Sequence, residues 1–483
     1  MRAGTSAAQG LLAAALAMVA FRLAWSSRTW PLIHDAPLMH YIAWRIQHGA
    51  VPYRDLFDMN APGPYLIHLL LLRTLGGGDL AWRIFDLGWL ALTCWVVALY
   101  AWPVGVGPAA VAAGLVAVYH LAGGVWLAGQ RDFLLCAFLI GGAQLVASPA
   151  TWWRLILAGV VVGAGVTLKP PAAIFLIVLA AVAAVAAARE GRVWWTPPLA
   201  VLAGGAAPPL GCLAWLAWTG GLRAFVEIFV EYDLPVYSRL ARVWPWTALG
   251  WWPFGWRVWA LFAVLVLAAG ATRRWDTRRA LVLAGLAYGV VHFLAQGKGW
   301  EYQVYPLATF ACLGAGFAVA APARAVRGTA LLASALLGLQ LYVKGVQELR
   351  PAWITAKAQR VDRIVADLRG RVGPEDTVQV LDTGEGGIHA LLRLGVRQPT
   401  RFIYDFPVFY DEDRPVVRRL RAEFLRELEA APPKFIVVLE RGWPSGGYAR
   451  IARFPALATW IAAAYRLDRE GPEYRVYAKR ADL

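Results

Sequence analysis

Long uninterrupted blocks of apolar residues run through the first two thirds of this chain, and they restrict its fold more than any other feature. A helix needs roughly 20 apolar residues to cross the hydrocarbon layer of a membrane. Blocks of that length are typical of a polytopic helical membrane protein, as is a composition that is 59% hydrophobic and only 16% charged.

The blocks predict about eleven transmembrane helices. The first block carries Arg22 and precedes no small-residue cleavage site, so we expect a retained span rather than a signal peptide. All four cysteines fall inside predicted spans, which argues against disulfides and thiolate metal sites. The spans are predicted at 10–29, 80–101, 107–127, 131–147, 153–168, 171–188, 197–218, 255–271, 279–296, 302–321 and 327–345.

Basic loops set the predicted orientation. Under the eleven-span count the loops 188–192, 273–279 and 323–327 share one side with Arg2 and Arg154. Loops rich in Arg and Lys stay in the cytoplasm, so we expect a cytoplasmic N-terminus in a bacterial inner membrane. The segments 31–78, 219–253 and 350–483 then face outward. The net charge of +16 fits anionic lipid headgroups and a phosphate-bearing lipid better than nucleic acid.

The composition changes to that of a soluble domain at about Arg350. "DTVQVLD" and "KFIVVLE" predict buried strands, the segment 414–431 predicts an amphipathic helix, and "GPEYRVYAKR" predicts an edge strand. We therefore expect a transmembrane domain over 1–349 and a small outward α/β domain over 350–483. Within the outer segment 31–78, two helices are predicted to lie in the membrane interface, at 40–49 and 64–75.

Ionisable and polar groups gather at the predicted outward ends of spans. Such groups are expensive near lipid and imply a pathway or a site. We expect them to converge on one cavity just outside the bilayer core. They come from four stretches: Asp35, Arg54, Asp55 and Asp58; "GQRD" (129–132); "TLKPP" (167–171); and "QGKGWEYQVYP" (296–306).

These stretches resemble the bacterial membrane glycosyltransferases of the GT-C fold, the superfamily of protein O-mannosyltransferases (glycosyltransferase family 39) and of the lipid A aminoarabinose transferase. The similarity lies in "HDAPLMHYIAWRIQHGAVPYRDLFDMNAPGPYLIHLLLLRTLG", "GQRDFLLCAFLIGGAQL", "GVTLKPPAAIFLIV" and "QGKGWEYQVYPL", four motifs in the family's order. The resemblance implies an inverting transfer of a sugar from a polyprenyl-phosphate carrier to an acceptor hydroxyl at the outer membrane face. The acceptor can be a glycan, a lipid or a protein.

That reaction assigns roles to the polar residues. Asp35 is the candidate base for the acceptor hydroxyl, and Asp132 orients the acceptor or tunes Asp35. Donor phosphate would be bound by Arg54, Arg131, Lys169 and Lys298. The residues expected to line the substrate are His34, Tyr53, Asp55, Gln296, Trp300, Tyr302 and Tyr305.

No cofactor or metal site is expected with certainty. Many relatives in this superfamily carry two adjacent acids where this chain has His34 and Asp35, so a divalent cation, plausible for an acid pair, is less supported here. The histidines of the outer segment lack a close ligand spacing.

Each assignment has a structural alternative. Asp35 can cap the helix that follows it, and Asp55 and Asp58 can be solvated loop carboxylates. Arg131 with Asp132 can form a simple ion pair, and the lysines can snorkel to headgroups. The aromatic residues over 244–259 fit an interfacial belt, and "DTGEGG" (382–387) fits a turn.

A transporter or flippase of lipid-linked glycans is the rival function. Transporters usually show two related halves and broken helices near the membrane midplane, and this sequence shows neither. A polymerase or ligase acting on lipid-linked glycans is harder to separate from the transferase, because it needs the same phosphate-binding cations.

Overall fold

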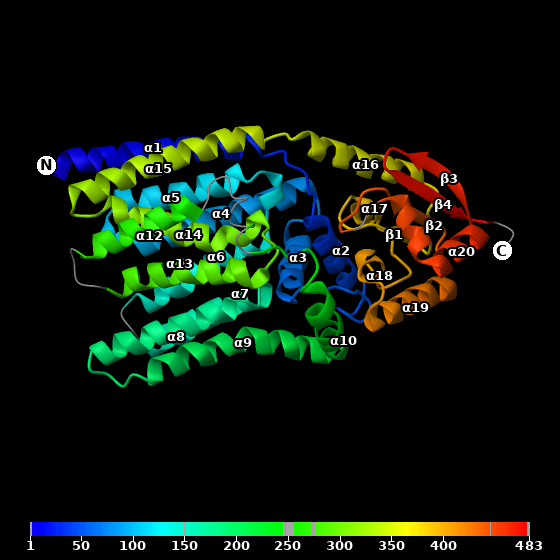
Figure 1. The fold of residues 1–483 in the computed structure, drawn as a ribbon, viewed down its shortest axis with the longest axis horizontal. Helices are drawn as coiled ribbons and strands as arrows, with labels where there is room; N and C mark the ends of the chain where they lie inside the picture. The colour runs from blue at the N-terminus through cyan, green and yellow to red at the C-terminus, as the bar shows by residue number, and fades with distance from the viewer. Residues whose placement is uncertain are drawn as a thin grey trace.

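The computed structural model describes residues 2–148, 151–244, 247, 256–271, 276–444 and 446–480. An elongated helical bundle occupies one end of the molecule, and a mixed domain with a small sheet occupies the other (Figure 1). The two chain termini lie at these opposite ends.

A helix occupies each of the eleven predicted spans. Seven of the helices among the described residues are long and apolar enough to cross a membrane, while α5, α7 and α12 are shorter apolar helices. The chain is therefore a multi-pass membrane protein, and the number of crossings stays a prediction. The helices are α1 (Arg2–Ser26), α4 (Asp79–Ala101), α5 (Val106–Ala122), α6 (Arg131–Val146), α7 (Trp152–Leu168), α8 (Ala172–Arg189), α9 (Thr196–Thr219), α12 (Trp256–Ala271), α13 (Thr277–Gln296), α14 (Tyr305–Val319) and α15 (Arg324–Gln347).

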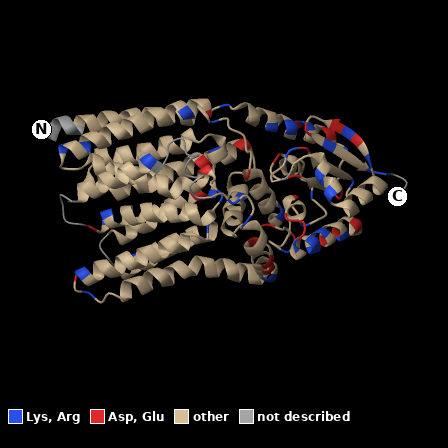
Figure 2. Cartoon of the chain, viewed as in Figure 1, with Lys and Arg blue, Asp and Glu red and all other residues tan. Residues whose placement is uncertain are grey.

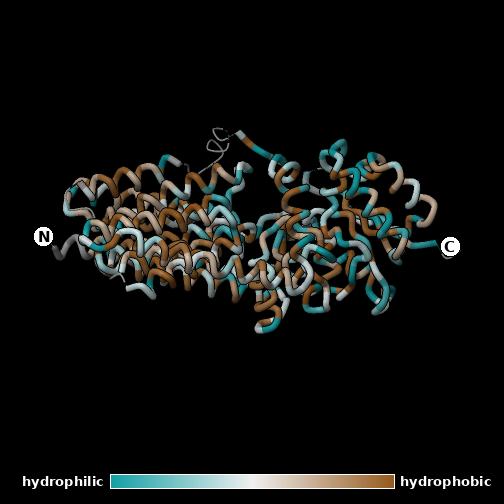
Figure 3. The backbone as a smooth tube through the Cα atoms, turned by 90° about the horizontal axis from the view of Figure 1, so that it is seen from below, coloured by the Kyte–Doolittle hydropathy of each residue, from teal (hydrophilic) through white to brown (hydrophobic). Residues whose placement is uncertain are grey.

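Small residues allow close packing inside this bundle. A Cβ placed at Gly159 of α7 would overlap the backbone of α9 at Val201 and Gly205. Van der Waals contact between closely approaching backbones is the main force between helices in lipid, where the hydrophobic effect is absent. The tube view shows hydrophobic residues throughout the bundle and hydrophilic ones concentrated toward the other end (Figure 3).

Two short helices of the outer segment cross the end of the bundle (Figure 1). They are α2 (Ala36–Gln47) and α3 (Gly63–Thr74), so both helices predicted in this segment are present, with α2 beginning four residues earlier than expected. Gly63 at the start of α3 lies directly against Thr167 of α7, and a Cβ there would overlap Thr167. The outer segment is thus packed onto the bundle.

A second segment that was predicted to face outward follows α9. It contains α10 (Leu222–Glu227) and a π-helical stretch, η3 (Ile228–Tyr237). Much of the predicted aromatic belt over 244–259, and residues 273–275 of the predicted basic loop 273–279, lie outside the described residues.

The segment predicted as a terminal domain, 350–483, contains a four-stranded sheet with the order β1-β2-β4-β3 and is called the terminal domain below. β1 and β2 are parallel, and β4 is antiparallel to both of its neighbours. Helices α16 (Ala352–Leu368), α17 (Gly387–Leu394), α18 (Phe406–Phe409), α19 (Pro415–Ala430) and α20 (Pro455–Ala464) accompany the strands β1 (Val378–Leu381), β2 (Phe435–Leu439), β3 (Tyr465–Gly471) and β4 (Tyr474–Lys479).

One strand prediction is wrong. The segment 471–480 was expected at an edge, but β4 lies between β2 and β3. The tight hairpin between Gly471 and Tyr474 folds β3 back onto the outer side of β4, so β3 takes the edge. The two predicted buried strands are present as β1 and β2, and every residue of both is buried.

The terminal domain shares a hydrophobic core with the outer segment. Phe57 stacks on Phe402 with ring centroids 5.4 Å apart, and the Phe57 amide donates to the Arg401 carbonyl at 2.7 Å. The Tyr41 hydroxyl accepts from the Gln398 amide at 3.0 Å. These contacts seat the terminal domain on α2 and its neighbours. Charged residues are sparse along the bundle and concentrate at this junction and beyond it (Figure 2).

Candidate functional site

A cavity of about 350 Å³ lies where the bundle, the outer segment and the terminal domain meet. Each of the three parts supplies polar and aromatic side chains to its wall. The outer segment gives His34, Asp35 and Asn60; the adjoining end of the bundle gives Trp126, Arg131, Trp300 and Tyr302, with Tyr237 from η3; and the terminal domain gives Lys357, Arg360, Glu385, Tyr404, Arg441 and Trp443.

Asp35 stands at the position before α2 but does not cap that helix through its side chain. All of α2 is described, and none of its backbone amides receives a hydrogen bond from the carboxylate. The carboxylate faces the cavity instead, 3.5 Å from the His34 Nε2 atom. Burial alone would raise the pKa of Asp35, but His34 and Arg131 outweigh it and hold the pKa below its ordinary value. Asp35 is therefore ionised at neutral pH.

His34 turns the chain into the cavity. Its φ of 67° lies in the left-handed region, which is uncommon for a residue other than glycine. Its ring lies on Trp126 with centroids 3.6 Å apart. Burial lowers the pKa of His34 to about 4, so the imidazole is neutral at pH 7.

Arg131 brings a positive charge to the same cavity. It is the first residue of α6, and the backbone of Gln130 before it is extended. Within the described part of the chain, its guanidinium has no hydrogen-bond acceptor, while it lines the cavity near Asp35. Its donors are available to an anion, and the planar fork suits phosphate.

Asp132 and Lys169 form a buried pair one layer behind this wall. The Lys169 Nζ atom lies 2.9 Å from the Asp132 carboxylate, whose side chain has no exposed surface. His292 Nε2 lies 2.7 Å from the same carboxylate, and Gln296 donates to it at 3.0 Å. The described residues that line the cavity do not include Asp132, Lys169 or Gln296. The predicted groups at the span ends therefore meet in two layers.

Lys298 lies beside the cavity in an aromatic surround. Its Nζ atom is 3.3 Å from the centroid of the Tyr237 ring and 5.1 Å from that of Trp300. Trp443 of the terminal domain adds a third ring at 5.8 Å. Burial lowers the pKa of Lys298 to about 7, so part of its population is neutral at physiological pH.

The structure places four other predicted site residues away from the cavity. Arg54 and Asp55 form a pair at 2.8 Å, with more than half of the Arg54 side chain exposed, and Asp55 also accepts from the Val51 amide. Tyr53 donates to the Asn60 carbonyl at 2.6 Å. Tyr305 bonds His120 deep in the bundle.

The solvated-loop interpretation of Asp58 is wrong. Only 1% of Asp58 is exposed. Its carboxylate accepts a hydrogen bond from the Tyr65 hydroxyl at 2.6 Å and another from the Asn60 side chain at 2.8 Å. It stabilises the fold of the outer segment from inside.

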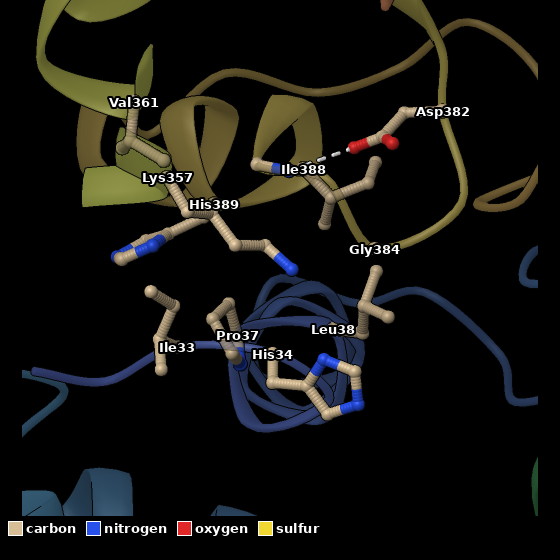
Figure 4. A pocket seen from close by; sticks show the side chains of 11 residues that line it. Ile33, His34, Pro37, Leu38, Lys357, Val361, Asp382, Gly384, Ile388 and His389 are labelled. Atoms are coloured by element: carbon tan, nitrogen blue, oxygen red, sulfur yellow. Dashed lines mark hydrogen bonds between the residues drawn. The ribbon is translucent and has the colours of Figure 1, made fainter. Parts of the chain in front are cut away.

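The sequence analysis did not predict that the terminal domain contributes to the cavity wall. The "DTGEGG" segment is a turn, as expected, because Asp382 accepts hydrogen bonds from the amides of Glu385, Gly386 and Gly387. Its Gly384 and Glu385 nevertheless form part of the cavity wall. Figure 4 shows an adjoining small pocket, where Lys357 reaches from α16 toward the start of α2. The amphipathic pattern of α16, with Lys357 and Arg360 three residues apart, was the available signal.

Metal binding finds no support in side-chain clustering. Within the residues that the structure describes, no group of three His, Cys, Asp or Glu side chains is placed to hold a metal ion. The sequence-based statement about a divalent cation stays a prediction.

Comparisons with solved structures identify the fold of this chain. No family model and no curated protein matches this chain. Its structure is similar to that of ArnT from Cupriavidus metallidurans bound to undecaprenyl phosphate, with a TM-score of 0.62, 15% identity and 98% coverage of both chains. ArnT in the apo state gives 0.61 at 12% identity and the same coverage.

A third structure is more distant. The apo oligosaccharyltransferase of Archaeoglobus fulgidus gives a TM-score of 0.50 at 12% identity, over 94% of this chain and 71% of that one. ArnT and this enzyme have the GT-C fold, and the likeness shows that this chain has it too.

Proposed function

We propose that this GT-C-fold protein is an inverting glycosyltransferase of the bacterial cytoplasmic membrane. It would move a sugar from a polyprenyl-phosphate carrier to an acceptor hydroxyl at the outer face. The observation that carries the proposal is the shared cavity of Asp35 and Arg131: a carboxylate that does not cap its own helix, near a guanidinium without a hydrogen-bond partner among the described residues.

Asp35 supplies the base. As the acceptor oxygen bonds to the anomeric carbon of the sugar, its proton passes to the Asp35 carboxylate, and the bond from that carbon to the phosphate oxygen breaks. One displacement from the opposite face inverts the anomeric centre. The lowered pKa of Asp35 keeps it ionised and ready to accept the proton.

Arg131 receives the leaving phosphate. Negative charge develops on the phosphate oxygens as the bond breaks, and a cation already fixed in a partly dry site stabilises it without reorganisation. The similarity to a structure of ArnT bound to undecaprenyl phosphate supports a lipid phosphate as the ligand. Trp300 and Tyr302 offer aromatic faces for the sugar.

The second layer fixes the first. Asp132, Lys169 and Gln296 hold the start of α6 against α13 and the end of α7, and so place Arg131. Arg54 and Asp55, which pair at the surface, have no part in this scheme.

The test is transfer of radiolabelled sugar from a mixed pool of polyprenyl-phosphate sugars, in membranes with equal amounts of protein. We expect Asp35→Asn to lose about a hundredfold or more of the transfer rate, as for a missing general base. Arg131→Gln should lose donor binding as well. Arg54→Gln is the matched control, a cation of the outer region outside the cavity, and should transfer normally.

Two outcomes would count against the proposal. Equal transfer by wild type and Asp35→Asn removes Asp35 from the mechanism. Absence of transfer by the wild type with every donor, together with movement of lipid-linked glycan across the membrane, favours the flippase instead.

A further inference from the structure

A buried charged cluster lies in the bundle below the cavity. Arg83 and Asp86 of α4 form an ion pair and are 2% and 0% exposed. The His120 Nε2 atom of α5 lies 3.2 Å from the Asp86 carboxylate. Charged groups inside a membrane helix are costly, so their retention calls for a reason.

One oxygen of Asp86 is bonded to the turn that leads into α6. Oδ1 accepts a hydrogen bond from the Gly129 amide at 2.6 Å. Gly129 has a φ of 62°, and a Cβ there would overlap the Trp82 ring, so the turn is tight and fits only glycine. The next two residues both point to the site: the side-chain Nε2 atom of Gln130 is 3.5 Å from the Asp35 carboxylate, and Arg131 lines the cavity.

His120 contacts the first turn of α6 itself, just after the turn at Gly129. Its ring stacks on Phe133 with centroids 3.8 Å apart and planes 22° from parallel. Because a carboxylate only accepts, Nε2 donates to Asp86, and Nδ1 is hydrogen-bonded to the Tyr305 hydroxyl at 2.8 Å. The cluster thus connects α4, α5 and α14 to the first turn of α6.

We infer that Asp86 is a positioning residue for donor binding: its bond to the Gly129 amide sets the turn that aims Arg131 at the donor phosphate. This inference rests on the proposed role of Arg131. Asp86 itself is fully buried and, among the described residues around the cavity, forms no part of the wall. It acts through the backbone and does not touch the substrate.

Two double variants isolate the hydrogen bond from the buried charge. Arg83→Met/Asp86→Asn and Arg83→Met/Asp86→Leu both remove the ion pair, and only the Asn variant keeps an oxygen that can accept from Gly129. The readout is affinity of the purified full chain for polyprenyl phosphate, followed by tryptophan fluorescence, since Trp126 and Trp300 line the cavity. This assay needs no turnover.

We expect the Asn variant to bind polyprenyl phosphate as the wild type does. The Leu variant should bind about tenfold more weakly, because Arg131 would lose one charge-assisted hydrogen bond to the phosphate. In an Arg131→Gln background the two variants should bind equally, because the effect passes through Arg131. A merely structural role would not depend on Arg131.

Four results would overturn the inference. Equal affinity of the Asn and Leu variants, with clear wild-type binding, removes the positioning role and leaves the proposed function standing. An Asn–Leu difference that persists without Arg131 does the same. A wild type that binds no polyprenyl phosphate refutes the proposed function, and this inference with it. If the Leu variant does not fold, hydrogen exchange of the wild type tests the bond instead. The Gly129 amide should exchange slowly, and fast exchange refutes its bond to Asp86.

Discussion

The Asp132–Lys169 pair gives the sharpest test of the two-layer site. Replacing Lys169 by Met leaves a carboxylate with no exposed surface, whose remaining partners among the described residues are His292 and Gln296. Breaking a buried ion pair by removing one partner costs about 3–5 kcal/mol, because the remaining charge stays desolvated. We expect Lys169→Met to lower the free energy of unfolding by that amount, measured by denaturation in mixed detergent micelles.

The cycle is completed by removing both charges. Asp132→Leu/Lys169→Met should be more stable than Lys169→Met, because no unpaired charge remains, and less stable than the wild type, because His292 and Gln296 lose their acceptor. The control is Arg223→Met, which breaks an exposed pair with Glu227 and should leave the free energy of unfolding almost unchanged. A Lys169→Met variant as stable as the control refutes the buried-pair reasoning, as does a double variant that is no more stable than Lys169→Met.

Three further predictions concern pH, packing and the terminal turn. Because burial lowers the pKa of His34 from 6.5 to about 4, only the unfolded chain takes up this proton between those pH values. Stability should therefore fall by up to about 3 kcal/mol as the pH drops from 6.5 to 4. His34→Asn, which tolerates positive φ, should remove that part of the loss in pH-dependent denaturation, and an unchanged slope would contradict the assignment. Gly204→Ala in α9 would press on the backbone of α7 and should cost about 1–3 kcal/mol in the same assay, whereas Gly211→Ala, with open space around it, should be neutral; equal effects would refute the close packing. Asp382→Ala should destabilise the protein by about 2 kcal/mol or more, since three amides lose their acceptor, and full stability would show that the turn holds without it.

Much of the helical framework could be predicted from the sequence. The length of apolar blocks reflects the thickness of the membrane, a constraint that acts on each segment locally, and so a helix lies in every predicted span. The runs "VQVL" and "FIVVL" likewise identify buried strands by composition. The order of the strands could not be predicted from composition, because tertiary packing decides that the hairpin places β3 at the edge.

Only part of the candidate site could be predicted from the sequence. Its polar groups could be assigned to one side of the membrane, and Asp35, Arg131, Trp300 and Tyr302 do share a cavity. The sequence could not tell that Asp132 and Lys169 would neutralise each other behind the wall, nor that Arg54 would turn outward to Asp55. Arg131 and Asp132 are neighbours in the chain, yet successive residues of a helix point in different directions.

The sequence by itself determined that this chain spans a membrane many times, with its ionisable residues concentrated at the ends of spans and in a polar terminal segment, because hydrocarbon excludes charge and each span must satisfy its own backbone. Only the tertiary structure decided which charges face a common space. Lys357 and Glu385 lie more than 300 residues from Asp35 in the sequence and meet it because the terminal domain shares a core with the outer segment. Pairing and burial depend on such long-range packing, which no local pattern encodes.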